Sequence, residues 1–264
     1  MASSVLAASE GGFHKPSIDE FFPGALLFAG TPFEINRIML IRLVMTVVVA
    51  AFFLIAMRRP KLVPRGVQNL GEYALDFVRV HIAEEVMGRE NGRRFLPLLT
   101  TFFFLVWACN LAGVIPLFNI AGSAVVGLPL VLSVVTYVVF NYAGIKSQGF
   151  GRYLKNQLIP SGVPVYMLPL VLPIELVSTF ILRPFTLTVR LLANMMAGHL
   201  MLVLFFSATS FLLFEATALF KPVGVLSFAM GFVFTLFELL VQFLQAYIFT
   251  MLTAVYIDLA MHEH

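Results

Sequence analysis

Ionisable residues lie inside long apolar stretches of this sequence, where charge is costly. Arg190 and His199 share the run VRLLANMMAGHLMLVLFF, and Glu238 is the only Asp, Glu, Lys, Arg or His between Pro222 and Ile257. An arginine near a bilayer centre costs about 2.5 to 3.5 kcal/mol on insertion scales, and its pKa above about 12 keeps it charged. A histidine, with a pKa of about 6.5, loads and unloads protons readily. These residue types predict a fixed positive charge at membrane depth, with a histidine and a carboxylate in the same long apolar segments.

Helical spacing sorts the rare polar residues onto faces. His199 is nine positions after Arg190, which places it on the opposite helix face and ~13 Å further along. If Pro184 only kinks the helix, a turn of about 100° per residue places six polar residues on one face, as a polar stripe. These residues are Glu175, Thr179, Arg183, Thr186, Arg190 and Asn194. A second stripe contains Thr235, Glu238, Gln242, Gln245 and Tyr256. Two such faces can enclose a water-filled path, and the small residues Ala193, Ala197 and Gly198 permit close helix approach.

Simpler roles exist for the same residues. Thr186, Thr235 and Gln242 are suited to ordinary hydrogen bonds between helices, and His199 and Glu238 to a buried structural pair. Arg42 and Lys221 lie near span ends, so we expect their charges to reach the interface. Arg190 lies too far from the ends of its apolar run for its side chain to reach the interface.

The composition indicates a membrane protein. Of 264 residues, 60% are hydrophobic and only 12% are charged, and a soluble domain cannot bury that much apolar surface. The 17 Lys and Arg residues, against 14 Asp and Glu, cluster at the ends of apolar runs, a pattern of membrane topology rather than nucleic-acid binding. Cys109 is the single cysteine, which excludes an internal disulfide or a thiolate metal site.

Apolar run lengths predict an all-α polytopic membrane protein with about five membrane helices. The predicted spans are 38–57, 95–117, 124–145, 165–213 and 223–257, within a single membrane domain of residues 35–264 that follows an extracytoplasmic segment of residues 1–34. The last two spans exceed one crossing, so we expect long, strongly tilted helices. The run 165–213 contains Pro169, Pro173 and Pro184, and fits either one kinked helix or a hairpin turning near Arg183 and Pro184.

Residues 66–91 follow an amphipathic pattern, which predicts a helix on the cytoplasmic membrane surface, with a soluble linker helix as the alternative. Bases follow the first and third spans, at Arg58, Arg59, Lys61, Arg65, Lys146, Arg152 and Lys155. The positive-inside rule then places the N-terminus outside and the C-terminus in the cytoplasm, whereas a hairpin at Pro184 would move the C-terminus outside. The first residues show no cleavable signal peptide, so the first span must direct insertion.

Motifs for nucleotide binding or hydrolysis are missing from the sequence. It contains no GxGxxG, P-loop, HExxH or GxSxG pattern, and we expect no cofactor, no metal and no catalysis by this chain alone.

Two segments carry a family resemblance. The run from Arg190 to His199, RLLANMMAGH, and the run from Leu244 to Phe249, LQAYIF, resemble subunit a of the F-type ATP synthases. The resemblance extends to NLAGVIP from Asn110, to Pro-Ile-Glu175 and to Arg183-Pro184, and it covers nearly the whole chain from about Phe33.

This resemblance implies a proton-translocating stator that faces a rotating ring of c subunits. In the family, two aqueous half-channels load and unload ring carboxylates, and the arginine that matches Arg190 separates them and prevents leak. The implied proton path contains Asn194, His199, Glu238, Gln242, Gln245 and Glu175. Implied partners are the c ring, a peripheral-stalk b-type subunit, indirectly the water-soluble ATPase sector, the lipid bilayer and protons, in a bacterial plasma membrane.

Two features differ among family members. The histidine and the carboxylate occur here in the reverse order of some relatives, which keeps their chemistry. Some relatives have an acidic residue where this chain has Ala112 and Gly113, so proton exit is expected to depend more on Glu175, hydroxyl groups and water.

Other function classes fit less well. A self-contained proton or cation transporter is expected to show paired repeats with broken helices, and none is apparent. A lipid-modifying enzyme needs a nucleophile with a base, or a metal-ligand cluster. Proton or sodium coupling is left open by this chain, although the His199 and Glu238 pair favours protons.

Overall fold

The computed structural model describes residues 25–27, 35–58, 61, 63–115, 122–158 and 167–262. Within these ranges the protein is almost entirely helical, which confirms the predicted all-α class. The two strands found there, β1 (Ala25–Leu27) and β2 (Ile35–Asn36), form a small antiparallel pair before the first long helix. Most of the predicted N-terminal segment 1–34 lies outside the described residues.

Five helical segments of the described chain are long and apolar enough to cross a membrane, as predicted. The first and third are α2 (Arg37–Met57) and α5 (Gly127–Gln148), close to the predicted 38–57 and 124–145. The second, α4 (Glu85–Leu111), begins before the predicted residue 95 and ends before 117. The fourth runs over Pro169–Glu215 and the fifth is α9 (Lys221–Met261).

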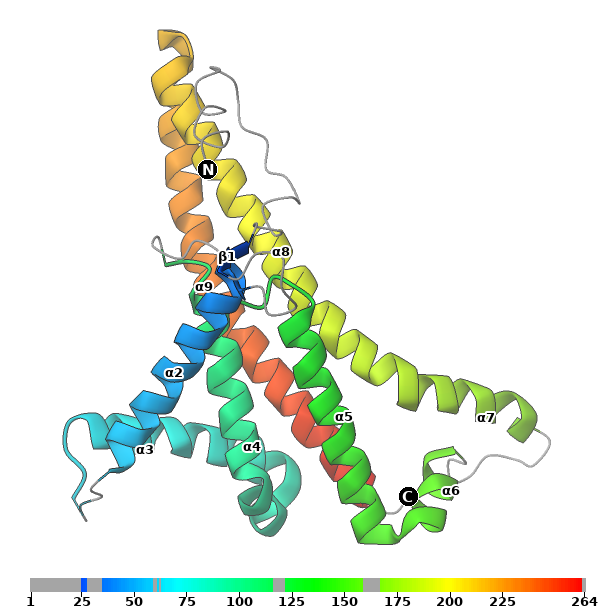
Figure 1. The fold of residues 1–264 in the computed structure, drawn as a ribbon. Coiled ribbons are helices and arrows are strands. Elements are labelled where there is room, and N and C mark those ends of the chain that lie inside the picture. Colours follow the sequence, from blue (N-terminus) through cyan, green and yellow to red (C-terminus); the bar gives the residue numbers. More distant parts are fainter. Residues whose placement is uncertain are drawn as a thin grey trace.

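The amphipathic segment lies across one end of the bundle (Figure 1). It comprises α3 (Val67–Val78), the π-helical turn η3 (Arg79–Glu84) and the first residues of α4. The helix breaks at Gly88, whose φ of 71° and ψ of 172° suit glycine best, so the surface helix ends before the predicted residue 91.

One half of this surface helix's apolar face packs against the helix bundle, and the other half is exposed. Val78 and Ile82 are fully buried in the main core, whereas Val67 and Leu70 are exposed. The packing of one half against the bundle disfavours a free linker helix. The exposed half retains the apolar residues that a membrane-surface helix needs.

The fourth segment is one continuous bent helix. It consists of α7 (Leu168–Val177), the π-helical η5 (Ser178–Leu182), α8 (Arg183–Ser210) and the π-helical η6 (Phe211–Glu215). The alternative of a hairpin at Pro184 is therefore wrong. Pro184 lies in the first turn of α8, where its missing N–H is tolerated, and the preceding π turn widens the backbone at the bend visible in Figure 1.

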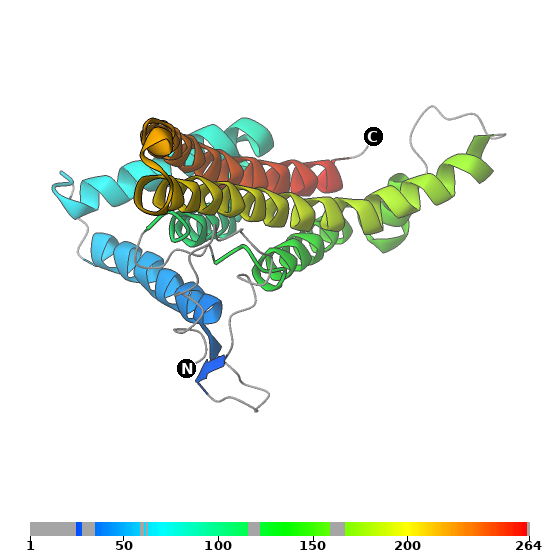
Figure 2. The same cartoon turned by 90° about the horizontal axis from the view of Figure 1, so that it is seen from above.

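Helices α8 and α9 run side by side and are joined through the short 3-10 turn η7 (Ala218–Phe220), as Figures 1 and 2 both show. In the lower part of Figure 1, α5 packs against both helices of this long pair, whereas α4 packs against α9. All four helices contribute to the main core, with residues that include Phe102, Phe103, Leu132, Phe140, Leu187, Leu191, Ala246 and Phe249. Since lipid is as apolar as this core, close packing and polar contacts hold the helices together more than the hydrophobic effect does.

Polar contacts join the same helices at defined heights. The Ser133 hydroxyl on α5 donates to the Pro184 carbonyl oxygen on α8 at 2.6 Å. The hydroxyls of Thr136 on α5 and Thr253 on α9 lie 3.3 Å apart. These contacts hold α5 against the beginning of α8 and the second half of α9.

Arg42 has a role that the sequence did not predict. Its guanidinium donates to the carbonyl oxygens of Gly122 and Val125, the latter at 2.9 Å, in the connection before α5. The expected extension of this side chain to the interface stays a prediction, to which the structure adds two carbonyl partners within the chain. The carbonyl oxygens of Gly122 and Val125 lie just before the start of α5, and the Arg42 guanidinium supplies their hydrogen-bond donors.

Several basic side chains lie together at one end of the bundle. The start of α4 and the ends of α5 and α9 meet around a cavity of about 550 Å³ whose lining includes Arg94, Lys146 and His262. The grouping agrees with a single base-rich side, while the direction of that side across a membrane stays a prediction.

Candidate functional site

Arg190 lies on the outer face of α8 and is exposed. Its neighbours Leu187 and Leu191 are buried in the main core, so the guanidinium stands at the level of the packed middle of the bundle. The hydrogen bonds and ion pairs found within the described ranges do not include Arg190. A guanidinium in this position therefore needs an anion or water from outside the described chain.

The face around Arg190 is flat and partly polar. Thr186, Ala193, Asn194 and Ala197 are also exposed on α8. The side chains of the two alanines are small, so another helix can approach the backbone beside the guanidinium closely. The predicted use of small residues for helix approach therefore applies here to the outer face.

His199 and Glu238 meet on the opposite side of α8. Both are buried, and they line one enclosed cavity of about 10 Å³, close to the size of a single water-sized sphere. Gln242, one turn after Glu238 on α9, lines the same cavity and hydrogen-bonds the Glu238 carboxylate. The remaining lining residues are Gly113, Met195 and Leu202.

The expected separation of Arg190 from His199 is confirmed. One side chain faces outward and the other faces the interior between α8 and α9. A shared cavity of His199 and Glu238 suits both a proton relay and a structural pair, so the relay stays a prediction.

Asn194 joins the two sides of α8. Its side-chain amide donates to Oε1 of Gln245 at 2.7 Å, which connects the exposed face beside Arg190 to the buried face of α9. Two further polar atoms on that α9 face, Oε1 of Gln242 and Nε2 of Gln245, are buried without a hydrogen-bond partner among the described residues. Since buried polar atoms are normally satisfied, this face is suited to water rather than to lipid.

The long polar stripe of the fourth segment does not stay on one face. Thr179 is buried, whereas Thr186, Arg190 and Asn194 are exposed. Thr179 lies within the π turn η5, whose wider turn breaks the assumption of 100° per residue before the exposed group begins.

Glu175 occupies a separate place on α7. It is half-buried and accepts a hydrogen bond of 3.3 Å from the Thr179 hydroxyl. Arg183, at the start of α8, lies over the ring of Tyr256 with its Cζ atom 5.4 Å from the ring centroid. Neither Glu175 nor Arg183 lines the cavity of His199 and Glu238.

Some cavity residues were missed by sequence reasoning. Met195 and Leu202 are apolar and give no signal of their own. Gly113 was connected with proton exit, yet it lies in the cavity of His199 and Glu238. Its helix end is held by Asn110, which accepts a hydrogen bond from the Ser123 hydroxyl. The motif that contains Asn110 and Gly113 was the available signal. Among the described residues, no group of three His, Cys, Asp or Glu side chains is placed to hold a metal ion.

Comparison with known proteins agrees with this arrangement. The family model described as ATP synthase A chain matches residues 39–258. A relative in Rhodococcus erythropolis, named ATP synthase subunit a, is 57% identical over all of this chain and 96% of its own length. Relatives of the same name in Parafrankia sp. and Streptomyces lividans are 39% identical, covering 100% and 87% of this chain and 89% and 80% of their own lengths.

Proposed function

We propose a mechanism from the premise that this chain belongs to the ATP synthase A chain family, in which it is the proton-channel part of the membrane sector. In this proposal the chain is a stator that exchanges protons with the carboxylates of a rotating ring of c subunits. The ring passes along the outer face of α8. The observation that carries the proposal is that Arg190 is exposed on this face while His199 and Glu238 share a closed cavity behind it.

Arg190 acts on the ring carboxylate through its permanent charge. A ring carboxyl group in lipid is protonated because an isolated negative charge there is costly. Opposite the guanidinium the ionised form is favoured, so the carboxyl pKa falls and its proton leaves. The same positive charge repels a proton that would pass directly between the two half-channels, which prevents leak.

The cavity of His199, Glu238 and Gln242 belongs to the half-channel on the outer side. A histidine next to a carboxylate can accept and return a proton at little cost. Gln242 orients the Glu238 carboxylate by its hydrogen bond. Asn194 and Gln245 carry the polar connection from this interior to the ring-facing side of α8.

The other half-channel starts near the bend of the fourth segment. Glu175 and the hydroxyl of Thr179 form its polar group there, at a distance from the His199 cavity along the helix. The membrane potential supplies about 2.3 kcal/mol per proton per 100 mV, which biases rotation in one direction.

The partners of the chain follow from the same proposal. They are the c ring, a peripheral-stalk b-type subunit and, through them, the water-soluble ATPase sector. The chain itself performs no catalysis. It lies in a bacterial plasma membrane with its C-terminal end in the cytoplasm, and the pair of His199 and Glu238 favours protons as the coupling ion.

The test is Arg190→Ala in the assembled complex. We expect loss of proton-driven ATP synthesis and of ATP-driven pumping in membrane vesicles, with a passive leak. Arg190→Lys should restore little, since an ammonium lacks the delocalised, always charged guanidinium. Arg93→Ala, at an exposed arginine near the start of α4, is the matched control and should pump normally. Normal coupled pumping by the Arg190→Ala complex would overturn the proposal.

A further inference from the structure

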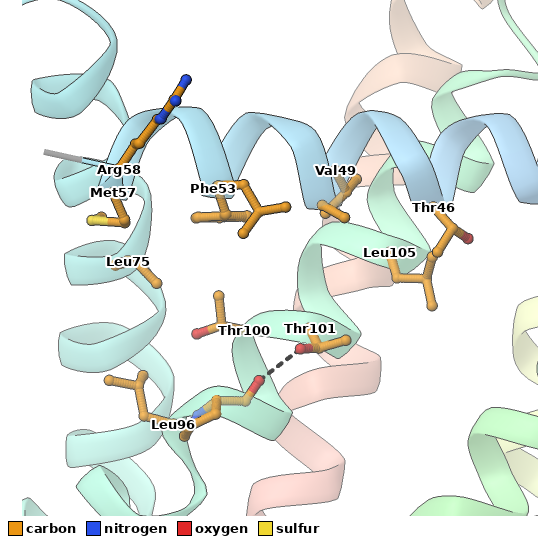
Figure 3. A pocket seen from close by; sticks show the side chains of 13 residues that line it. Thr46, Val49, Phe53, Met57, Arg58, Leu75, Leu96, Thr100, Thr101 and Leu105 are labelled. Carbon is orange, nitrogen blue, oxygen red and sulfur yellow. Dashed lines mark hydrogen bonds between the residues drawn. The ribbon is translucent and has the colours of Figure 1, made fainter.

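Two cavities meet at the end of α2. The larger is an apolar groove of about 1010 Å³ between α2, α3 and α4. Figure 3 shows Val49, Phe53 and Met57 of α2 facing Leu96 and Leu105 of α4 across it, with Leu75 of α3 at one end. The hydroxyl of Thr101 in this groove is already satisfied, because it donates to the Pro97 carbonyl oxygen at 2.8 Å. Apart from the Thr100 hydroxyl, which has no partner among the described residues, the groove offers a mainly apolar surface to an occupant.

The smaller cavity is polar and has a volume of about 430 Å³. Its charged and amide side chains are Arg58, Arg65 and Gln68, and Arg58 also lines the apolar groove. In Figure 3 the Arg58 guanidinium lies at one end of the groove and is directed away from the apolar side chains. The two cavities thus share Arg58 as a lining residue, with the apolar groove on one side of it and the basic cavity on the other.

The basic end lacks a described counterion. The ion pairs found within the described ranges include neither Arg58 nor Arg65. The nearby Glu72 accepts a hydrogen bond of 2.7 Å from Gln68, whose side chain also bonds the backbone of Lys61 on both sides. Gln68 therefore holds Lys61 against the start of α3, and the two arginines remain available to an anion.

We propose that these joined cavities bind one anionic phospholipid, with an acyl chain in the groove and the headgroup phosphate between Arg58 and Arg65. The guanidinium fork matches phosphate geometry, and α2 ends at Met57, so the arginines stand where headgroups lie. Basic pockets beside membrane helices are suited to anionic headgroups. A hydrophobic helix from another subunit would cover the groove but leave both arginines without an anion.

This site requires only that the chain lies in a membrane, so its test is independent of the proton path. The complex that carries the chain is purified in mild detergent, exposed to phosphatidylglycerol or phosphatidylcholine, and weighed intact by native mass spectrometry. We expect one tightly retained phosphatidylglycerol and no retained phosphatidylcholine. Each of Arg58→Ala and Arg65→Ala should weaken retention about fivefold, as one basic residue near the surface does. Arg93→Ala, at an exposed arginine outside both cavities, is the matched control.

The apolar end is tested separately. Ala50→Phe places a ring in the groove and should abolish phosphatidylglycerol retention, whereas Val48→Phe, on an exposed position outside the groove, should not. Equal retention of both lipids, or equal retention by the Arg58→Ala and Arg65→Ala variants and the unaltered complex, would overturn the proposal. So would a photoreactive benzoylphenylalanine at position 101 that captures a polypeptide instead of a lipid.

Discussion

The carboxylate of Glu238 occupies the space where a side chain at residue 198 would begin. A Cβ atom built on Gly198 would lie 2.3 Å from both carboxylate oxygens, far inside any allowed contact. The glycine thus lets α9 place its carboxylate directly against the backbone of α8, beside His199. A close approach of this kind brings the two ionisable groups into one cavity.

Gly198→Ala should therefore displace Glu238 and damage proton transfer without touching Arg190. The displaced atoms are the far end of a flexible side chain, so the fold should change little, whereas we expect proton flux in vesicles to fall about tenfold, which corresponds to ~1.4 kcal/mol on the barrier. The shorter carboxylate of Glu238→Asp should partly restore flux in the double variant. Gly231→Ala is the control, because its Cβ would meet Phe205 Cβ at 3.3 Å, which requires a shift of only a few tenths of an ångström and touches neither His199 nor Glu238. Unchanged flux in Gly198→Ala would show that the Glu238 position is unimportant.

His199→Ala should slow proton flux by at least about tenfold, since it removes a group able to carry the proton. Gln242→Ala in the same cavity removes only a hydrogen bond to Glu238 and should have a clearly smaller effect. Passive proton uptake by vesicles and ATP-driven pumping both measure this difference. Equal or negligible effects of the two variants would favour the structural-pair reading of His199 and Glu238.

Asn194→Ala should destabilise the contact between α8 and α9. It leaves Oε1 of the buried Gln245 without the donor that now lies 2.7 Å away, a loss of about 1 to 3 kcal/mol for a buried polar group. A double-mutant cycle with Gln245→Ala, followed by thermal unfolding of the purified complex, should show a coupling energy between the two sites. Thr186→Ala is the control, since that exposed hydroxyl bonds only carbonyl oxygens of its own helical segment. Additive effects would mean that the contact carries no energy.

Tyr153 gives a prediction for alkaline pH. It lies in α6 (Phe150–Leu158), outside the membrane spans, and its hydroxyl donates to Oδ1 of Asn141 at 3.0 Å. Burial raises the pKa of Tyr153 to about 12, against the lowering effect of Arg183, with a further rise from Tyr137. The folded state therefore favours the neutral phenol. Its contribution to stability is complete below the unfolded pKa of about 10 and is lost as pH rises towards 12.

Thermal unfolding of the purified complex between neutral and alkaline pH tests this linkage. Tyr153→Phe should be about 1 kcal/mol less stable at neutral pH, through the lost hydrogen bond, but should lose less stability above pH ~10. Tyr142→Phe, at an exposed position of α5, is the control. Parallel pH profiles for Tyr153→Phe and the unaltered chain would contradict the assignment.

The membrane helices were predictable where apolar length alone defines them. α2 and α5 agree closely with their runs because charged or turn-forming residues bound them on both sides. The start of α4 was not predictable from hydropathy, since its first turns are polar. The chain changes direction at Gly88, whose positive φ of 71° interrupts the helix. The choice between a kinked helix and a hairpin at Pro184 was also open, because a proline permits both.

The sequence by itself determined that this chain lies in a membrane, that its helices are long, and that Arg190 and His199 point in opposite directions, because these follow from run length and a fixed helical period. Only the tertiary structure decided that α8 turns Arg190 outward and seats His199 against Glu238, Gln242 and Gly113. Contacts between residues so distant in the chain depend on how helices cross and how closely they approach. The space at Gly198 and the π turn before Pro184 set that geometry here.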